Sequence, residues 1–392
     1  MTAASLPFAS PLEAARALAP RIRALAEQID RDRELPPDLV RAIADAGLFR
    51  MGMPAAWGGY GADALTVLRT VEEVARADGS TGWCVAMGVN TFRQSAEFRD
   101  DVRRTIFYSD PVGVGAGSTA VRGRAVAVQG GYRVTGRWFF ASGCMHASSL
   151  LGGCHVYDGD TRRMRSSDMA EELIVYVWPK SAGQIVDTWR TSGMRGTGSH
   201  DIVVTDVFVP EEHTFPKQEQ RARVSGLVNK LPSFDLSGCN FACVGLGVAR
   251  AAIDELIELA AVKTPRASTD LLRARPLAQA HVAEAEATLR SARAFLFEAV
   301  DDMQRSVAAG EGVTPGQRAV VRLAMTHAAA SASRAVNLVR VAAGTTPIFT
   351  TSPLERLVRD AQVVETHVQL QAVNYEIVGR SLFGLESHHP LF

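Results

Sequence analysis

The sequence predicts an α+β fold in three parts: an N-terminal helical domain over residues 1–110, a middle β domain over 111–225 and a C-terminal four-helix bundle over 226–392. Three observations predict it. Apolar residues recur at helical spacing before Pro111, β-branched runs that end in proline follow, and long helical segments return near residue 238. Helices, then strands, then a late bundle are typical of an α+β protein.

The N-terminal domain begins with an amphipathic helix over residues 11–31, whose leucines and isoleucines repeat at helical spacing. Pro36-Pro37-Asp38 opens a second helix, which ends near Gly47. A glycine-rich loop over 53–63 follows. Two further helices are expected over 63–77 and 80–98.

The β domain has its clearest signal at Gly130-Gly131, where AVAVQGGYRVTGRWFF alternates on both sides of the turn and predicts a hairpin. Two β-branched runs, 172–179 and 200–210, end in proline and predict further strands. The polar segment 159–171 predicts an exposed loop. We expect a β-barrel or sandwich.

The C-terminal part predicts a bundle with short connections. Its helices are expected near residues 238–262, 270–308, 314–343 and 353–384.

Composition narrows the class of protein. Hydrophobic residues make up 47%, and 42 basic residues balance 42 acidic ones, so neither nucleic acid nor an anionic membrane is expected as the main partner. The five cysteines are scattered, which fits a reducing cytoplasm better than a disulfide framework. The N-terminus has no secretory signal pattern, and no uninterrupted run of 18 apolar residues predicts a membrane span. We therefore expect a cytoplasmic protein.

Four blocks of sequence carry a resemblance to a known family. They are ADGSTGWCVAMGVNTF (77–92), GGYRVTGRWFFASGCMHA (130–147), WRTSGMRGTGSHDIVVTDVFVPEEHT (189–214) and GTTPIFTTSPLERLVRDAQVVETH (344–367). In this order, the blocks resemble the acyl-CoA dehydrogenase superfamily over nearly the whole chain. The segments DGSTGW, GRWFFASG and RGTGSHD resemble those of one branch, the two-component flavin-dependent monooxygenases. That branch includes the oxygenase component of 4-hydroxyphenylacetate hydroxylase, steroid-phenol hydroxylases and dibenzothiophene monooxygenase.

This resemblance implies an oxygenase component that receives reduced FAD or FMN from a separate NAD(P)H-flavin reductase. Molecular oxygen would add to the flavin at C4a, and the hydroperoxide would hydroxylate an aromatic or heteroatom-containing small molecule. The family's fold also implies a homotetramer.

The position of the dehydrogenase base supports oxygen chemistry. Common acyl-CoA dehydrogenases carry a glutamate in a Tyr-Glu-Gly triplet about nine residues after the Arg-Asp of the last block. Counting from Arg359-Asp360 places His367 at the tyrosine and Val368 at the glutamate, and valine cannot abstract a proton. Glu365 is three positions off. Two alternatives stay open: a dehydrogenase with its base on another helix, and a non-catalytic relative that acts as a binding subunit.

The resemblance places three candidate catalytic residues beside the flavin. Ser142 matches the serine near flavin N5 or the peroxide, where a hydroxyl can both donate and accept a hydrogen bond. His367 matches a histidine that could deprotonate a phenol or hold the hydroperoxide proton. Asn90 stands where several relatives carry a histidine, and its amide can orient a ligand but cannot act as a base.

Other residues are expected to bind the cofactor or the substrate. Phe140, Ala141 and Ser142 are expected at the flavin, Arg266 at its phosphate, Gly344 and Thr345 at the flavin of a neighbouring subunit, and Arg195 at either flavin or substrate. The expected substrate-pocket residues are Trp83, Asn90, Phe92, Phe234 and Phe241. No metal site is predicted, because Cys239 and Cys243 lack a second pair and no zinc-protease motif occurs.

Overall fold

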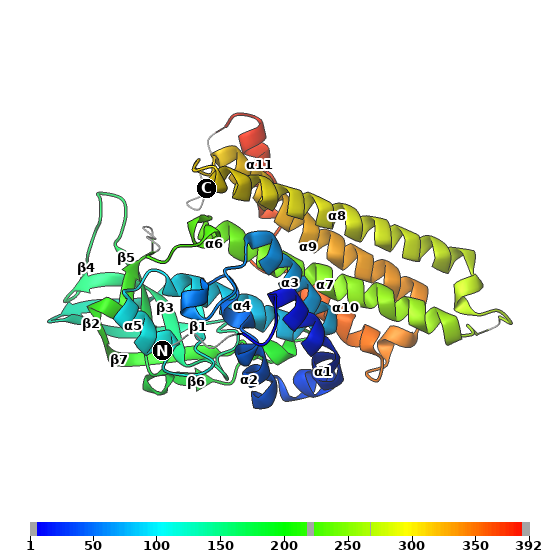
Figure 1. The fold of residues 1–392 in the computed structure, drawn as a ribbon, viewed down its shortest axis with the longest axis horizontal. Helices are drawn as coiled ribbons and strands as arrows, with labels where there is room; N and C mark the ends of the chain where they lie inside the picture. Colours follow the sequence, from blue (N-terminus) through cyan, green and yellow to red (C-terminus); the bar gives the residue numbers. More distant parts are fainter. Residues whose placement is uncertain (1–5, 218–222, 267, 386–392) are drawn as a thin grey trace.

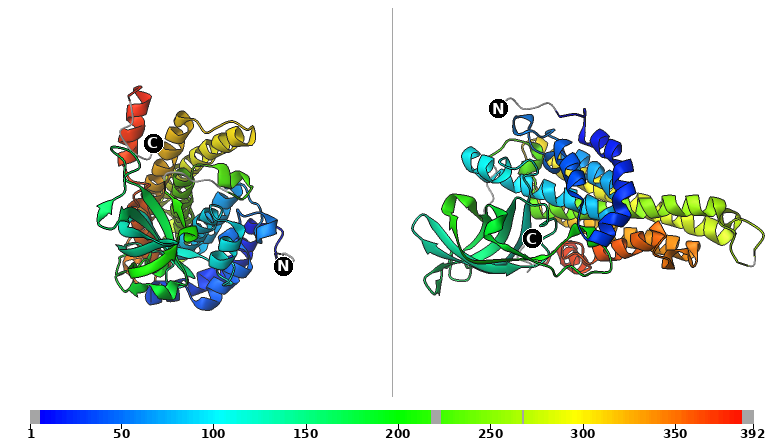
Figure 2. Two further views of the ribbon diagram at one scale, coloured as in Figure 1. Left: turned by 90° about the vertical axis from the view of Figure 1, so that its left-hand side faces the viewer. Right: turned by 90° about the horizontal axis from the view of Figure 1, so that it is seen from below.

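The computed structural model describes residues 6–217, 223–266 and 268–385. The α+β fold class is confirmed. Figures 1 and 2 show the strands gathered at one end, the N-terminal helices packed against them, and the C-terminal helices projecting as a long arm from the other side. The predicted cofactor-binding residues of the β domain and those of the arm therefore lie at opposite ends of the molecule.

The N-terminal part consists of α1 (Pro11–Asp32), α2 (Pro37–Asp45), η1 (Leu48–Arg50), η2 (Ala55–Trp57), α3 (Ala64–Ala77), α4 (Gly79–Ser95) and α5 (Asp100–Phe107). Capping side chains fix where these helices begin. Ser10 Oγ accepts from the backbone N–H of Glu13, and Asp78 caps α4 by accepting from Thr81 N at 2.7 Å. Helix α5 was not foreseen as a separate element. Almost every side chain of α4 is buried, so this helix runs through the core.

The middle part forms one mixed sheet with the order β6-β7-β2-β1-β3-β5-β8, and β4 pairs with β3. The strands are β1 (Gly115–Val128), β2 (Gly131–Trp138), β3 (Ser149–Asp158), β4 (Thr161–Arg162), β5 (Glu172–Val177), β6 (Gln184–Val186), β7 (Asp201–Pro210) and β8 (Thr214–Pro216). The hairpin prediction is confirmed, because β1 and β2 pair antiparallel around Gly130, whose φ is +79°. Strands β1 and β3 pair in parallel.

Trp138 lies in the hydrophobic core formed by this sheet. Its indole is 1% exposed and donates Nε1–H to the carbonyl of Gly153 at 2.9 Å. Three glycines lie against the ring, and a Cβ added at Gly123, Gly136 or Gly152 would come within 2.5 Å of it. The backbone can therefore close around the indole only where side chains are absent.

The C-terminal part consists of α6 (Leu227–Lys230), α7 (Ser233–Val262), η6 (Leu272–Ala274), α8 (Pro276–Ala308), α9 (Pro315–Ala343), η7 (Thr346–Ile348), α10 (Pro353–Glu365) and α11 (Val373–Leu382). The single helix predicted over 353–384 is wrong, because α10 ends and α11 begins after a link of turns. Thr366 donates to the carbonyl of Val363, and Gln371 donates to the carbonyl of Thr366, so side chains take backbone groups that a continuous helix would use. This break places His367 in a turn.

Helix α7 is, among the described helices, long and apolar enough to cross a membrane by length and composition. However, 89% of its most apolar window is buried inside the fold. Its hydrophobicity is that of a core helix, which packs against α3, α4 and α9.

We predict that Gly152→Ala lowers the free energy of unfolding by about 1–3 kcal/mol, because the new methyl group overpacks against Trp138. Gly379→Ala is the matched control. It lies in α11 with open space around the added Cβ, so it should stabilise by about 0.5–1 kcal/mol. Urea unfolding of both variants checks this, and equal effects would contradict the packing of Trp138.

Candidate active site

The candidate site is centred on Trp83, which projects from α4. Its indole donates Nε1–H to Ser142 Oγ at 3.1 Å, stacks on Phe241 of α7 at 4.4 Å between ring centroids, and meets the edge of His367 at 5.3 Å. The ring centroids of Phe241 and His367 are 4.5 Å apart. The structure thus brings together four residues predicted from sequence, although they come from α4, α7, the β2–β3 loop and the α10–α11 link.

Ser142 begins a chain of buried hydroxyls. Its Oγ lies 2.7 Å from Ser199 Oγ, which lies 2.7 Å from Thr197 Oγ1. Thr197 donates its only hydroxyl hydrogen to the carbonyl of Met194, at 2.8 Å.

The direction of every hydrogen bond in the chain follows from that last contact. Thr197 must accept from Ser199, so Ser199 must accept from Ser142. Ser142 also accepts from Trp83, so its oxygen keeps one free lone pair and has no hydrogen left to offer. Ser142 is therefore set as an acceptor toward any ligand beside it.

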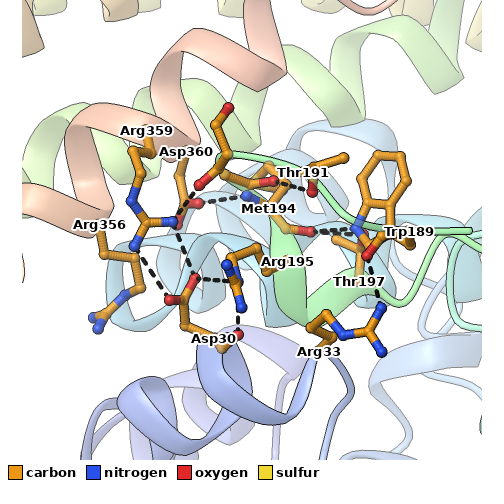
Figure 3. Close-up of polar contacts among 12 residues, drawn as sticks. Asp30, Arg33, Trp189, Thr191, Met194, Arg195, Thr197, Arg356, Arg359 and Asp360 are labelled. Carbon is orange, nitrogen blue, oxygen red and sulfur yellow. Dashed lines mark hydrogen bonds and ion pairs between the residues drawn. The ribbon is translucent and has the colours of Figure 1, made fainter. Parts of the chain in front are cut away.

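The loop that carries Thr197 and Ser199 is held by α1 and α10 (Figure 3). Met194 has a left-handed backbone with φ +52°, and its N–H donates to Asp360 Oδ1 at 2.5 Å. Arg359 binds the carbonyl of Ser192 and both carboxylate oxygens of Asp30, at 3.2 and 3.1 Å. A strained residue such as Met194 persists only where its surroundings over-determine it.

Two buried carboxylates lie behind this loop. Burial and the neighbouring charge of Asp78 raise the pKa of Asp360 to about 7, and burial also raises the pKa of Asp78. The guanidinium of Arg356 lies 4.0 Å from Asp78. Each acid holds a backbone amide, Met194 N for Asp360 and Thr81 N for Asp78, so both position the site.

His367 is neutral at physiological pH. Protein atoms crowd the ring, and the resulting desolvation lowers its pKa to about 4. Nδ1 accepts a long 3.4 Å hydrogen bond from Gln369 N, which assigns the proton of the neutral ring to Nε2. Val368 beside it is 67% exposed. His367 can thus donate a hydrogen bond without carrying a positive charge.

Phe140 provides an apolar surface beside Ser142. It is 68% exposed, has φ +61°, and meets Trp189 edge-on at 6.1 Å. The backbone N–H of buried Ala141 donates to the carbonyl of His200, which fixes the loop in this strained shape. An exposed aromatic ring next to a fixed acceptor suits a planar, polar-edged ring system such as a flavin.

Asn90 lies about two helical turns beyond Trp83 on α4. Its Oδ1 accepts from Asn240 Nδ2 at 3.1 Å, and this amide pair joins α4 to α7. Asn240 Oδ1 is buried and finds no hydrogen-bond donor among the described residues. The pair therefore leaves polar capacity unused inside the core.

Two other predicted pocket residues have contacts outside the cluster of Trp83, Phe241 and His367. Phe92 packs on Phe107 and Tyr108, on the face of α4 opposite Trp83. Phe234 lies 5.1 Å from the guanidinium of Arg322.

Arg195 donates Nε–H to the carbonyl of Asp30 at 3.0 Å, which turns that nitrogen toward α1 (Figure 3). Arg266 lies between α7 and η6, and Gly344 and Thr345 lie between α9 and η7. These links are at the outer end of the helical arm, away from the strands (Figure 1).

Sequence reasoning missed Thr197, Ser199 and Asn240. The turn containing Thr197 and Ser199 entered the sequence analysis only as a family motif and through Arg195. A Ser or Thr in a turn usually bonds locally, and sequence does not show which hydroxyls align. Asn240 lies in a helix, and its burial, which is the informative property, is visible only in the fold.

Two further features concern the surface hollows and the possible metal ligands of the structure. Surface hollows of about 670 and 440 Å³ lie along α7 near the α9–α10 link, and neither is lined by Ser142, Trp83 or His367. Within the described ranges, no group of three or more histidine, cysteine, aspartate or glutamate side chains is placed to hold a metal ion.

Comparison with known families gives two matches. Residues 12–96 match the acyl-CoA dehydrogenase N-terminal domain, and residues 239–372 match the acyl-CoA dehydrogenase C-terminal domain. The first contains α4 with Trp83 and Asn90. The second contains α7 with Phe241, and α10 with His367 after it.

Similar proteins include indole-3-acetate monooxygenase of Pseudomonas putida, 35% identical over 93% of this chain and 91% of that protein. The flavin-dependent monooxygenase oxygenase subunit HsaA of Rhodococcus jostii is 31% identical over 94% of this chain and 97% of its own length. The crystal structure of 3-HSA hydroxylase from Rhodococcus sp. RHA1 has a TM-score of 0.88 at 28% identity and covers 98% of this chain and 99% of that one.

We predict that the free energy of unfolding rises with pH between about 4 and 6.5 through His367, because the unfolded chain binds a proton there that the folded ring refuses. His367→Gln should remove this contribution. Urea unfolding across that range, for both proteins, measures it. An unchanged slope would show that the ring titrates normally in the folded state.

Asp360 should change the free energy of unfolding with pH in the direction opposite to His367. Its pKa is raised to about 7, so between the unfolded value near 4 and 7 the folded state keeps a proton that the unfolded chain releases, and stability falls as pH rises. We predict that Asp360→Asn, which keeps an acceptor for Met194 N, loses this slope and is more stable than the parent at pH 8.

Asp360→Leu is the control for that variant. It lacks the acceptor, so it should be less stable than the parent at every pH. Matching pH profiles for the parent and Asp360→Asn would contradict a buried, readily protonated Asp360.

Proposed function

We propose, since this chain belongs to the acyl-CoA dehydrogenase family and its relatives are flavin-dependent oxygenases, that it is the oxygenase component of a two-component flavin-dependent monooxygenase acting on an aromatic small molecule. The observation that carries the proposal is the pair of groups around Trp83: an acceptor-only Ser142 hydroxyl and a neutral His367 donor. The cofactor is reduced flavin, delivered by a separate reductase, and the co-substrate is molecular oxygen.

The residues of the β2–β3 loop fit a flavin ring. We assign the exposed face of Phe140 to the ring and the free lone pair of Ser142 to its N5 edge. Reduced flavin carries a hydrogen on N5 and oxidised flavin does not, so an acceptor-only hydroxyl favours the reduced form. When bound, the flavin supplies the two electrons that activate oxygen.

His367 and the aromatic rings complete the site. We assign the Nε2–H of His367 to a hydrogen bond toward the reacting oxygen, and its low pKa keeps it a neutral donor throughout the working pH range. Trp83 and Phe241 form an apolar wall that excludes water and stacks on an aromatic substrate. Asn90 orients the substrate from α4.

The environment of residue 368 disfavours the dehydrogenase alternative. Val368 points outward at 67% exposure and cannot remove a proton. The buried acids Asp78 and Asp360 each hold a backbone amide, so they are engaged in positioning. A binding subunit without activity would have no reason to keep the Ser142 hydroxyl aligned with two partners, Trp83 and Ser199.

The outer end of the arm supports assembly into a homotetramer. Lys263 ties the end of α9 by donating to the carbonyl of Ala343 and to Thr346 Oγ1. Gly344, Thr345 and Arg266 are exposed next to this tie, and the apolar Ile348 and Phe349 are 72% and 58% exposed. We assign this end to the phosphates of a neighbouring subunit's flavin, in a cytoplasmic enzyme.

We predict that Ser142→Ala weakens binding of reduced flavin about tenfold, about 1.4 kcal/mol, and weakens oxidised flavin less, because only the reduced form donates to the lost lone pair. Ser199→Ala keeps the Ser142 hydroxyl but frees its hydrogen, so it should also reduce the preference for the reduced form. Anaerobic titration with FAD or FMN in each redox state measures this.

Ser291→Ala, on an exposed face of α8, is the control and should change neither affinity. In air, with reduced flavin and a panel of phenols and indoles, Ser142→Ala should release more hydrogen peroxide per product formed. Equal loss of affinity for both redox states would contradict the assigned polarity of the hydroxyl chain.

A further inference from the structure

His200 lies between the two segments that form the exposed face of the candidate flavin site. It directly precedes β7, and its backbone carbonyl accepts from Ala141 N at 3.0 Å, which holds the β2–β3 loop. Its ring Nδ1 accepts from the consecutive backbone N–H groups of Thr188 and Trp189, both at 3.2 Å. One residue therefore ties the loop that carries Phe140 to the segment that carries Trp189.

These two hydrogen bonds fix the protonation of the imidazole. A ring nitrogen that accepts from two N–H groups carries no hydrogen of its own, so the ring is neutral and its proton is assigned to Nε2. The side chain is buried, and this burial is the main reason why the pKa of His200 is lowered. The neutral ring is thus the state that holds Thr188 and Trp189 in place.

The charged side chains around the ring make a second arrangement available. Asp187 Oδ1 lies 3.4 Å from Nδ1, and Arg33 binds both oxygens of that carboxylate at 2.7 and 2.9 Å. Arg190 also binds Asp187, and Glu34 and Asp201 act on the ring through space as further negative charges. A proton on Nδ1 would repel the two backbone N–H groups and attract Asp187, so the ring would exchange its amide partners for the carboxylate.

Trp189 connects this exchange to the flavin face. Its indole meets Phe140 edge-on at 6.1 Å between ring centroids and donates Nε1–H to the carbonyl of Met194 at 3.0 Å. Arg33, which holds Asp187, also donates to the carbonyl of Trp189 at 3.0 Å (Figure 3). A shift of Asp187 toward a protonated ring therefore disturbs both backbone groups of Trp189 and loosens its indole against Phe140.

We propose that His200 is a pH-sensitive positioning residue for the flavin: its neutral ring holds the Trp189 segment against Phe140, and its protonation releases that segment and weakens flavin binding. This inference rests on the proposed oxygenase function, in which Phe140 faces the flavin ring, and it adds the residue that regulates this surface. Because binding and protonation are linked, bound flavin should make the ring harder to protonate, and binding in acid should release protons.

Two substitutions separate the acceptor from its titration. The side chain of His200→Asn can present an amide oxygen near the position of Nδ1 and does not titrate, whereas His200→Leu has no acceptor. His155→Asn on β3 is the matched control, since that ring also has a carboxylate nearby, Glu172 at 3.9 Å. Each protein is titrated anaerobically with reduced FAD or FMN between about pH 8 and about pH 4.5. The ratio of affinities between two proteins at one pH cancels the ionisation of the flavin itself.

We expect the parent to lose affinity about threefold to tenfold relative to His200→Asn as the pH falls below the ordinary imidazole range, which is the effect of one modest hydrogen bond. His200→Leu should bind more weakly than His200→Asn at every pH, and His155→Asn should follow the parent. A parent profile that matches His200→Asn over the whole range would overturn the proposal, and this comparison stands even where His200→Leu folds poorly.

Hydrogen exchange without flavin gives a second measurement that does not depend on activity. Exchange at the backbone amides of Thr188 and Trp189 is resolved by mass spectrometry and compared between proteins at the same pH, which cancels the intrinsic rate. At neutral pH both amides should be protected in the parent and in His200→Asn, and should exchange about tenfold faster in His200→Leu. In acid the parent should lose protection and His200→Asn should keep it. Equal protection in all three proteins contradicts a segment held by the ring.

The outcomes separate this inference from the proposed function. Flavin binding that weakens in acid through His200, without any oxygenated product in air, supports the positioning role and counts against the oxygenase function. Oxygenation of an aromatic substrate, with equal flavin affinity of the parent and His200→Asn at every pH, supports the oxygenase function and rules out the role of His200.

Discussion

The hydrogen bond from Met194 N to Asp360 Oδ1 is the contact on which the rest of the site depends. It joins the end of the glycine-rich turn to α10 and holds Met194 in a left-handed conformation that a side chain does not favour. The carbonyl of Met194 then orients Thr197, and through Ser199 it sets the direction of the Ser142 hydroxyl. One buried carboxylate thus determines what a side chain in another domain offers to a ligand.

Helix α4 is the second constraint, because it carries both ends of the proposed pocket. Trp83 near its start touches the hydroxyl chain, Phe241 and His367. Asn90 near its end accepts from Asn240 of α7, whose Oδ1 finds no donor among the described residues. Burying polar groups lowers stability unless something binds them. The architecture of a dehydrogenase can therefore serve oxygen chemistry once the base is absent and these side chains take its place.

Much of the fold and part of the candidate site could be predicted from the sequence. The order of helices and strands follows from apolar spacing, and the Gly130 hairpin follows from turn chemistry. The break before α11 could not, since it depends on how Thr366 and Gln371 use backbone carbonyls. Ser142 and His367 were identified through family motifs, Trp83 and Phe241 were expected only as pocket residues, and the four do meet. Phe92 is, like Trp83, an aromatic residue of the same helix, but it faces the opposite side and packs on Phe107. Which side a helix turns toward the site is decided by the packing of the whole fold.

The most direct measurement follows the oxygen atom. The enzyme, loaded with reduced flavin, is exposed to isotopically labelled molecular oxygen with an aromatic substrate from the panel of phenols and indoles, and the product is analysed by mass spectrometry. The account predicts one labelled atom in each product molecule, with the second atom released as water. Unlabelled product, or oxygen recovered wholly as hydrogen peroxide, would contradict it, and so would oxidation of an acyl-CoA without air by an artificial electron acceptor.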